Sequence, residues 1–205
     1  MHSQIHSLRI DQVTDLVEGH FRSDPDGLSL LPLIAVYSLY QCLTMEIARY
    51  KDTRLIPEYN INGLQRRSIE SIRVNRNNGD LIEVLVVRHH KAITSRVIED
   101  TFYRFRDAQM CRYCFLTTVE PLVTPREREK IRDLVQRIET QQTCEVIIDG
   151  VLPTIRYYLR TLSDPSLFWH QYWDNQKSVP LATTDPNKIH LKIWQSLLKQ
   201  IATND

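Results

Sequence analysis

The sequence predicts an α/β domain with a small mixed sheet flanked by helices, and three observations lead to this prediction. The chain has 205 residues, of which 42% are hydrophobic and 25% charged, values typical of globular proteins with a sizeable core. Apolar positions switch repeatedly between helical and strand spacing, so that helices precede and alternate with about four strands. No repeat, low-complexity tract or linker divides the chain, which predicts a single domain over 1–205 with 1–27 as a helical lead-in.

The first elements are helical. Residues 10–21 predict an amphipathic helix, and residues 23–27 are a turn cluster. Pro32 opens a long apolar helix that runs to about Tyr50, and residues 51–66 predict a loop.

A hairpin and a helix follow. Residues 68–75 and 81–88 predict two strands, because the intervening Asn-Gly-Asp run is typical of a tight turn. Thr94 or Ser95 then caps a helix, and residues 112–118 predict the next strand.

The C-terminal half continues the alternation. Thr124-Pro-Arg-Glu127 has the pattern of a capping box with proline at the first helical position, and it predicts the start of a helix. Residues 144–148 predict a short buried strand, followed by helical segments at 150–162, 165–173 and from Asp185-Pro186 onward. The aromatic run 168–173 is typical either of a core or of a partner surface.

Composition argues against several function classes. The five glycines are isolated, so no glycine-rich phosphate cradle can form and P-loop or Rossmann chemistry is not expected. The N-terminus lacks the pattern of a signal peptide, and the uncharged stretch 28–45 fits a buried helix better than a membrane span. We therefore expect a cytoplasmic protein without a membrane partner.

Four cysteines stand at positions 42, 111, 114 and 144. In a reducing cytosol they are expected to be thiols. Cys111 and Cys114 have CxxC spacing, but they lie in a strand-like run, where positions three apart face opposite sides. Core packing is therefore favoured over a metal or redox role.

Positive charge is concentrated in one segment. The net charge is +1, yet residues 60–96 hold seven Lys or Arg against three acids, a balance of +4 that leaves −3 for the remainder. Arginine is the cation suited to bidentate phosphate and guanine contacts, and 19 of the 26 basic residues are arginines. The distribution is consistent with a nucleic-acid partner, and a solvated surface explains scattered arginines equally well.

Five blocks in a fixed order resemble one enzyme family. They are Leu30–Tyr37 with its continuation to Tyr50, His89–Thr94, Ile98–Phe105, Arg112–Thr118 and Ile147–Leu159. With the order helix, hairpin, helix, strand, helix, strand, the chain resembles the PD-(D/E)xK nucleases, and most closely the type II restriction endonucleases of the SacI-like kind. The resemblance implies a restriction-endonuclease-like core.

The resemblance also implies a catalytic site that this chain lacks. The family holds Mg²⁺ with one carboxylate on each of two neighbouring strands, and a lysine two residues after the second carboxylate activates water. The matching positions here are Ile69, Val86 and Arg88. Valine cannot bind a hard cation, and arginine stays protonated. Only Glu46 matches, on the helix that supplies an accessory carboxylate in the family.

A migrated site is the alternative. Glu99, one turn into the helix after the hairpin, could replace a carboxylate, and Lys91 could supply the amine. The other nearby acids are Glu70, Asp80, Glu83 and Asp100. Mg²⁺ would be a cofactor only in that case; otherwise no cofactor and no metal site are expected. His89 and His90 invite a catalytic interpretation, although a structural role is favoured.

The leading hypothesis is a DNA-binding protein on this fold with a degenerate, inactive nuclease site, acting as a subunit or accessory factor in restriction–modification or phage defence. The expected partners are double-stranded DNA and either a second copy of the chain or a sibling nuclease or methyltransferase subunit. The alternatives are an active type II site-specific deoxyribonuclease with migrated residues and a pure protein-interaction module. The residues expected to line the DNA face are Arg66, Arg67, Arg73, Arg76, Arg88, His89, Lys91 and Arg96.

Overall fold

The computed structural model of the chain describes residues 8–24, 30–58, 70–178 and 186–204, with only the backbone described for 186–189 and 200–204. These residues divide into two compact units. The sheet unit is 52–151, and the helical unit comprises the residues on either side of it, 1–51 and 152–205. The sequence predicts a single domain over 1–205 with a lead-in 1–27. The division into two compact units does not test that prediction.

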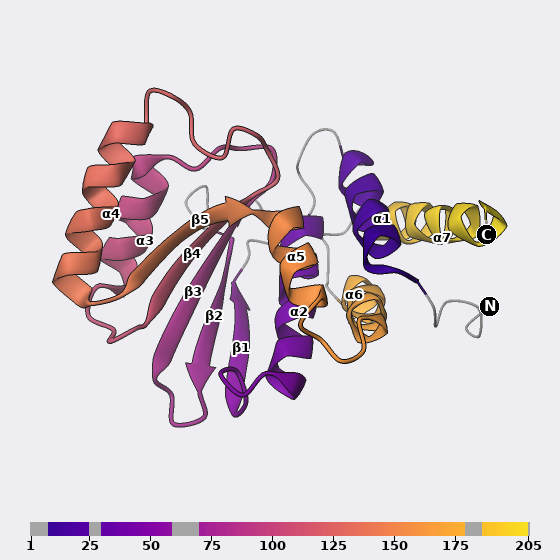
Figure 1. Cartoon of the computed structure of the whole chain (residues 1–205), viewed down its shortest axis with the longest axis horizontal. Coiled ribbons are helices and arrows are strands. Elements are labelled where there is room, and N and C mark those ends of the chain that lie inside the picture. The colour runs from indigo at the N-terminus through magenta and orange to yellow at the C-terminus, as the bar shows by residue number, and fades with distance from the viewer. Residues whose placement is uncertain (1–7, 25–29, 59–69, 179–185, 205) are drawn as a thin grey trace. The chain divides into compact units, whose positions relative to one another are not determined.

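The sheet unit contains one five-stranded mixed sheet with the strand order β1-β2-β3-β4-β5 (Figure 1). The pairs β1–β2 and β2–β3 are antiparallel, whereas the pairs β3–β4 and β4–β5 are parallel. The elements in chain order are β1 (Thr53–Glu58), β2 (Ser71–Arg76), β3 (Leu81–Arg88), α3 (Ser95–Phe105), β4 (Arg112–Thr117), α4 (Arg128–Gln142) and β5 (Glu145–Gly150). The predicted α/β class with a small mixed sheet and flanking helices is thereby confirmed.

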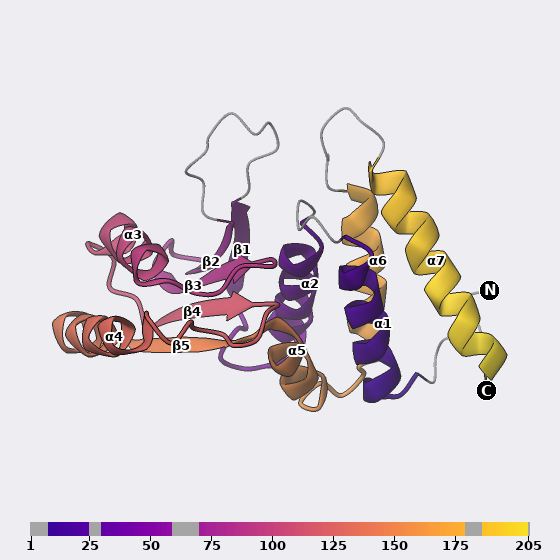
Figure 2. The same ribbon diagram turned by 90° about the horizontal axis from the view of Figure 1, so that it is seen from above.

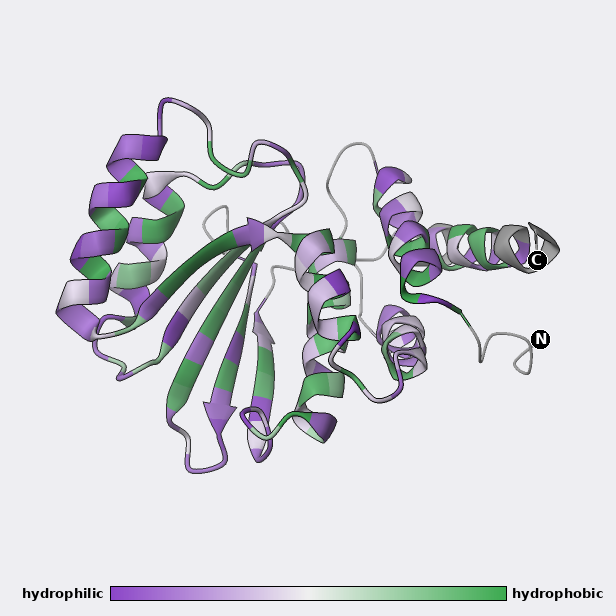
Figure 3. Ribbon diagram, viewed as in Figure 1, coloured by the Kyte–Doolittle hydropathy of each residue, from purple (hydrophilic) through white to green (hydrophobic). Residues whose placement is uncertain are grey.

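Helices α3 and α4 lie side by side and cover one face of this sheet (Figures 1 and 2). Alternate residues of β3 and β4 point toward them, because successive side chains of a strand face opposite sides. Val84 and Val86 of β3 pack there with Phe115 of β4 and with Ile98 and Leu134 of the helices, all buried. Figure 3 shows the resulting division of α4 into a hydrophobic and a hydrophilic side.

Strand β1 is a correction to the sequence analysis, which predicted a loop over 51–66. Its Pro57 has no N–H to donate, and such a residue argues against a central strand. β1 is an edge strand, hydrogen-bonded on one side to β2, so this position is tolerated.

The predicted capping box at Thr124 is a second correction. Helix α4 begins at Arg128, and the Glu127 side chain does not cap it. The Glu127 carboxylate instead accepts a hydrogen bond from the Ser95 N–H, 2.7 Å away at the start of α3. This bond lowers the pKa of Glu127. Glu127, which the sequence pattern assigns to a cap of its own helix, therefore caps the start of the neighbouring helix α3.

The helical unit is built from α1 (Ile10–Arg22), α2 (Leu31–Glu46), α6 (Ser166–Ser178) and α7 (Pro186–Asn204), with α5 (Val151–Leu159) following β5 directly. α1 and α6 lie between α2 and α7 (Figure 2). α2 ends four residues before the predicted Tyr50, and α6 runs five residues beyond the predicted 173. None of the described helices is long and apolar enough to span a membrane.

The aromatic run of α6 belongs mainly to the core of the helical unit. Phe168, Trp169 and Tyr172 are buried, so the interpretation of these three residues as a partner surface is wrong. Tyr172 also lies against a buried histidine of α1. His20 Nδ1 is 3.0 Å from the Tyr172 hydroxyl, and His20 Nε2 is 3.1 Å from the His190 carbonyl oxygen. Because a carbonyl only accepts, Nε2 carries the proton, and Nδ1 accepts from Tyr172.

We expect acid to destabilise the helical unit through His20. Burial lowers its pKa from 6.5 to about 3, so the folded state excludes a proton that the unfolded chain binds below pH 6.5. The free energy of unfolding should therefore fall by up to about 1.4 kcal/mol per pH unit between about pH 6.5 and pH 3. All three tryptophans (Trp169, Trp173 and Trp194) belong to this unit, so urea unfolding followed by tryptophan fluorescence at several pH values measures the effect.

His20→Gln is the matched variant, since an amide can donate and accept but does not titrate. It should flatten most of the pH dependence. Some should persist, because burial also lowers the pKa of His190. An unchanged pH profile in His20→Gln would mean that another group controls acid stability.

Candidate nucleic-acid interface

The carboxyl ends of β3 and β4 lie next to each other because the two strands are parallel. Arg88 ends β3 in register with Thr117 at the end of β4, and the Thr118 N–H donates to the Arg88 carbonyl, 3.1 Å away. In open α/β sheets, ligands bind beyond such ends. This is where the structure places several of the residues predicted from sequence.

The loops that leave the two strands are bound to each other. The Thr118 hydroxyl oxygen accepts from the His90 N–H at 3.0 Å, and the Thr117 hydroxyl donates to the Lys91 carbonyl at 2.8 Å. Further on, the Ile93 N–H donates to the Leu122 carbonyl at 2.9 Å. Thr117 is the last residue of the buried strand β4 and Thr118 follows it directly, a sequence signal that the prediction of candidate sites did not include.

The two histidines differ in their exposure. His89 is 4% exposed, its Nδ1 lies 3.0 Å from the Thr118 hydroxyl oxygen, and its ring stacks on His90 with centroids 4.1 Å apart. His90 is exposed and has φ 51°, a left-handed conformation that is uncommon for a residue other than glycine. His89 thus ties the two loops together, whereas His90 faces solvent.

Glu70 brings a carboxylate to the same end of the sheet. It precedes β2, and its carbonyl accepts from the Val87 N–H at 3.1 Å, which sets it opposite Val87. Partial burial raises the pKa of Glu70, while the positive charges of Arg88 and Lys91 act to lower it. In the sequence, Glu70 is only one of several acids near the predicted site. We call Glu70, Arg88, His89, His90 and Lys91 the β3-end cluster.

The β3-end cluster carries an excess of positive charge. Arg88 and Lys91 contribute two cations against the carboxylate of Glu70. The Arg88 Nε atom is buried, and none of the described residues offers it a hydrogen-bond partner. Lys91 is exposed. Such a set fits an anionic ligand better than a metal ion.

At the carboxyl end of β3, neither face of the strand carries a second carboxylate. Val86 faces α3 and α4, is 0% exposed and belongs to their hydrophobic core. Val87, opposite Glu70, points to the other face and is 1% exposed. Ile69, the predicted position on the first strand, lies outside the described residues. Val86, which the resemblance matches to the family's second carboxylate, and the adjacent Val87 are therefore both buried and apolar.

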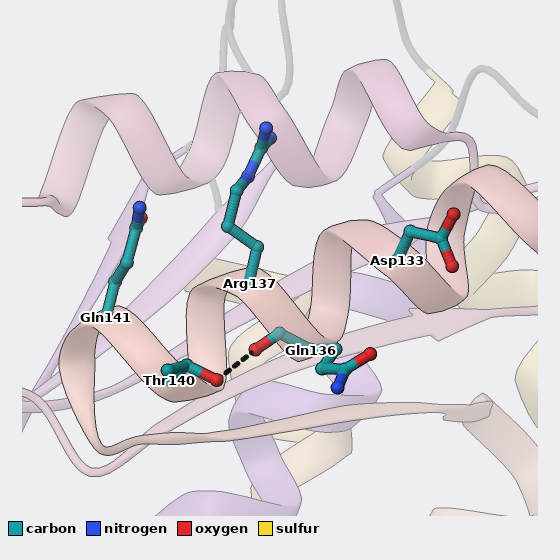
Figure 4. A pocket seen from close by; sticks show the side chains of 5 residues that line it. All are labelled: Asp133, Gln136, Arg137, Thr140 and Gln141. Atoms are coloured by element: carbon teal, nitrogen blue, oxygen red, sulfur yellow. Dashed lines mark hydrogen bonds between the residues drawn. The ribbon is translucent and has the colours of Figure 1, made fainter.

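The alternative acids are engaged elsewhere. Glu99 on α3 forms an ion pair with Arg137 of α4 at 3.7 Å. Arg137 reaches toward α3 beside a surface hollow of about 340 Å³ on α4, whose lining residues are Asp133, Gln136, Arg137, Thr140 and Gln141 (Figure 4). None of these five is a predicted site residue. Asp100 lies 3.7 Å from Arg96, and Asp80 lies in the β2–β3 turn, where it accepts from the Asn78 side chain.

Glu83 and Glu46 have structural contacts of their own. Glu83 is buried on the face of β3 opposite to Val86, as the alternation predicts, and accepts from the Cys114 thiol at 3.3 Å. Glu46 belongs to the helical unit, where its carboxylate accepts from the Ser163 N–H at 2.6 Å. Across the described ranges, no group of three or more His, Cys, Asp or Glu side chains is arranged to hold a metal ion.

The predicted DNA-facing residues are only partly brought together. Arg88, His89 and Lys91 lie in the β3-end cluster, and Arg96 is exposed on the first turn of α3, which follows the loop after it. Arg76 ends β2 at the opposite end of the sheet. Arg73 is held by Glu58 at 2.9 Å, and Arg104 also bonds that carboxylate. Arg66 and Arg67 lie outside the described residues.

No protein-family model matches the chain, and no curated protein matches it by sequence.

Val86→Asp tests the burial that excludes a carboxylate at this position. We expect a loss of more than about 3 kcal/mol in unfolding free energy, because the charge would enter an apolar core without a partner. Urea unfolding followed by far-UV circular dichroism measures it. Val135→Asp on α4, where valine is only partly buried, should cost distinctly less. Equal costs at both positions would contradict this description of the β3 face.

Proposed function

We propose that the chain is a DNA-binding protein with a restriction-endonuclease-like core and an inactive nuclease site. One observation carries the proposal. Where the family's chemistry needs a second metal-binding carboxylate, β3 has buried Val86 and Val87; the strand ends at the cation Arg88, and Lys91 lies in the loop that follows. The change removes a metal site and leaves positive charge at the end of the strand.

The order of elements supports this fold assignment. The family's order of helix, hairpin, helix, strand, helix, strand corresponds here to α2, the β2–β3 hairpin, α3, β4, α4 and β5. β1 is an addition at the edge. The parallel pairing of β3 with β4 and the antiparallel hairpin are compatible with a core of this kind.

Electrostatics favours binding over cleavage. Lys and Arg side chains that neutralise phosphates supply most of the affinity of DNA-binding proteins. A carboxylate pair repels phosphate until a metal ion is bound, so a site without that pair should bind DNA in the absence of Mg²⁺. Arg88, Lys91 and Arg96 are the described cations that we assign to phosphates. The expected partners are double-stranded DNA and a second copy or a sibling nuclease or methyltransferase subunit.

An active nuclease is the second candidate, and Glu70 is the observation that favours it. A carboxylate of raised pKa near Lys91 is the kind of pair from which a displaced site could be built. Glu99 is a weaker choice for a migrated carboxylate, because it is paired with Arg137. Mg²⁺ would be required in this case, with Glu70 as its protein ligand.

We expect no metal-dependent cleavage of duplex DNA by the purified chain. The physical reason is that one carboxylate does not fix Mg²⁺ for attack on a phosphodiester. Long unmethylated DNA incubated with Mg²⁺ or Mn²⁺ tests this. Discrete products that disappear with Glu70→Gln or Lys91→Gln would overturn the inactive site and establish the second candidate.

DNA binding should weaken steeply with salt. Three phosphate contacts by Arg88, Lys91 and Arg96 correspond to a log–log slope of about −3, and Arg66 and Arg67 could add up to about −2. Changing Arg88, Lys91 and Arg96 to Gln should reduce the magnitude of the slope by about 2 to 3. Fluorescence anisotropy with a labelled duplex, measured from low to moderate salt, gives the slope.

The matched control changes three cations at the opposite end of the sheet. Arg54, Arg76 and Arg106 are exposed, and their replacement by Gln removes the same charge. We expect a slope close to that of the unmodified chain. Equal effects of the two triple variants would show that binding responds to net charge and not to the β3-end cluster.

A further inference from the structure

Two cysteines lie at the amino ends of neighbouring strands. β4 and β5 are parallel, with Arg112 in register with Glu145. One residue earlier on each strand, Cys111 therefore stands beside Cys144, and the Glu145 N–H donates to the Cys111 carbonyl at 2.9 Å. Neighbouring strands are separated by about 4.8 Å, which lies within the Cα–Cα range of disulfides.

Both thiols belong to the same face of the sheet. Arg112 and Glu145 share one face, so the residues before them point to the other, the face covered by α3 and α4. Cys144 packs in that core and is 7% exposed, whereas Cys111 is exposed. The pair thus combines an exposed thiol, which a dissolved oxidant can contact, with a buried thiol, which can react only with the exposed one.

The CxxC spacing in the sequence identifies a different pair, which the sheet separates. Cys114 lies three positions after Cys111, on the opposite face, where its thiol donates to the Glu83 carboxylate. Joining Cys111 to Cys114 would require β4 to break. In the fold, the cysteine nearest to Cys111 is therefore Cys144 on the adjacent strand and not Cys114, which is nearest in sequence.

Backbone hydrogen bonds hold Cys111 in place, and Cys144 follows the C-cap residue of α4. The Cys111 N–H donates to the Ile82 carbonyl at 2.9 Å, which attaches it to β3. Thr143, just before Cys144, has φ 52° and ends α4. Each cysteine directly precedes the first residue of its strand, and the backbone bonds of Cys111 to β3 and β5 hold the two cysteines side by side.

We propose that Cys111 and Cys144 form an oxidation site, which a hydroperoxide converts to a disulfide. With hydrogen peroxide as the oxidant, the Cys111 thiolate attacks one oxygen and the O–O bond breaks; hydroxide leaves and takes up the proton that the thiol lost, which gives a sulfenic acid on Cys111 and water. The Cys144 thiolate then attacks the Cys111 sulfur, the S–O bond breaks, and hydroxide leaves as water. Two thiols lose two electrons in total, and hydrogen peroxide is reduced to two waters.

The second step should depend on pH. Cys111 is accessible to the oxidant, whereas burial and the nearby Glu139 carboxylate raise the pKa of Cys144. Less of Cys144 is thiolate at neutral pH, so the second step should become faster at higher pH. This site does not depend on the proposed DNA binding.

Peptide mapping by mass spectrometry tests the inference on the full chain. The protein is treated with hydrogen peroxide under native conditions, remaining thiols are alkylated after denaturation, and disulfide-linked peptides are identified. We expect a Cys111–Cys144 link, with Cys42 and Cys114 alkylated. A Cys111–Cys114 link, or Cys111 oxidised to the sulfinic acid while Cys144 is still alkylated, would overturn the proposal.

Variants add a readout that does not require the disulfide. Cys144→Ala should leave the sulfenic acid on Cys111, trapped by dimedone, with a yield several-fold above that of the unmodified chain. Cys114→Ala should form the same link as the unmodified chain. If Cys144→Ala does not fold, peptide mapping of the unmodified chain still tests whether the Cys111–Cys144 disulfide forms. The absence of any disulfide-linked peptide there contradicts the inference.

Discussion

The parallel pairing of β3 with β4 is the interaction on which the rest of the sheet unit depends. It requires α3 to cross from the carboxyl end of one strand to the amino end of the next, which places α3 over the face that Val84 and Val86 present. It also sets the ends of both strands side by side, where Thr117 and Thr118, at the end of β4, bind the loop after β3. One backbone arrangement therefore creates the core and positions the β3-end cluster.

That arrangement also explains why the valines of β3 matter. A strand that is covered by helices on one face, and whose central residues are buried on both, is stabilised by branched apolar side chains. A buried carboxylate near the end of such a strand is tolerated only when a metal ion or a cation compensates its charge. Val86 and Val87 remove that requirement, and folding of the sheet is then independent of any metal ion at this position. The charge that remains at the strand end is positive and exposed at Lys91.

Much of the fold could be predicted from periodicity, and the exceptions have physical causes. β3 and α3 begin where the sequence places them, because both have strong local signals: a glycine turn and a threonine cap. β1 was missed because an edge strand tolerates proline, which the pattern counts against a strand. Glu127 was assigned to the wrong helix because a cap across space has no sequence spacing. The candidate site was harder still, since the antiparallel register of β2 with β3 sets Glu70 beside Arg88 and places Arg76 at the opposite end of the sheet.

Hydrogen exchange of the full chain with and without a short duplex tests the central claim most directly. If DNA binds at the β3-end cluster, amides in peptides covering 88–96 and 117–123 should exchange more slowly in the complex, because the ligand stabilises the two bound loops. Peptides covering 106–111, at the opposite end of the sheet, should be unchanged and serve as the internal control. Protection at 106–111 without protection at 88–96, or a bound duplex that protects neither, would contradict the assignment of this site to DNA.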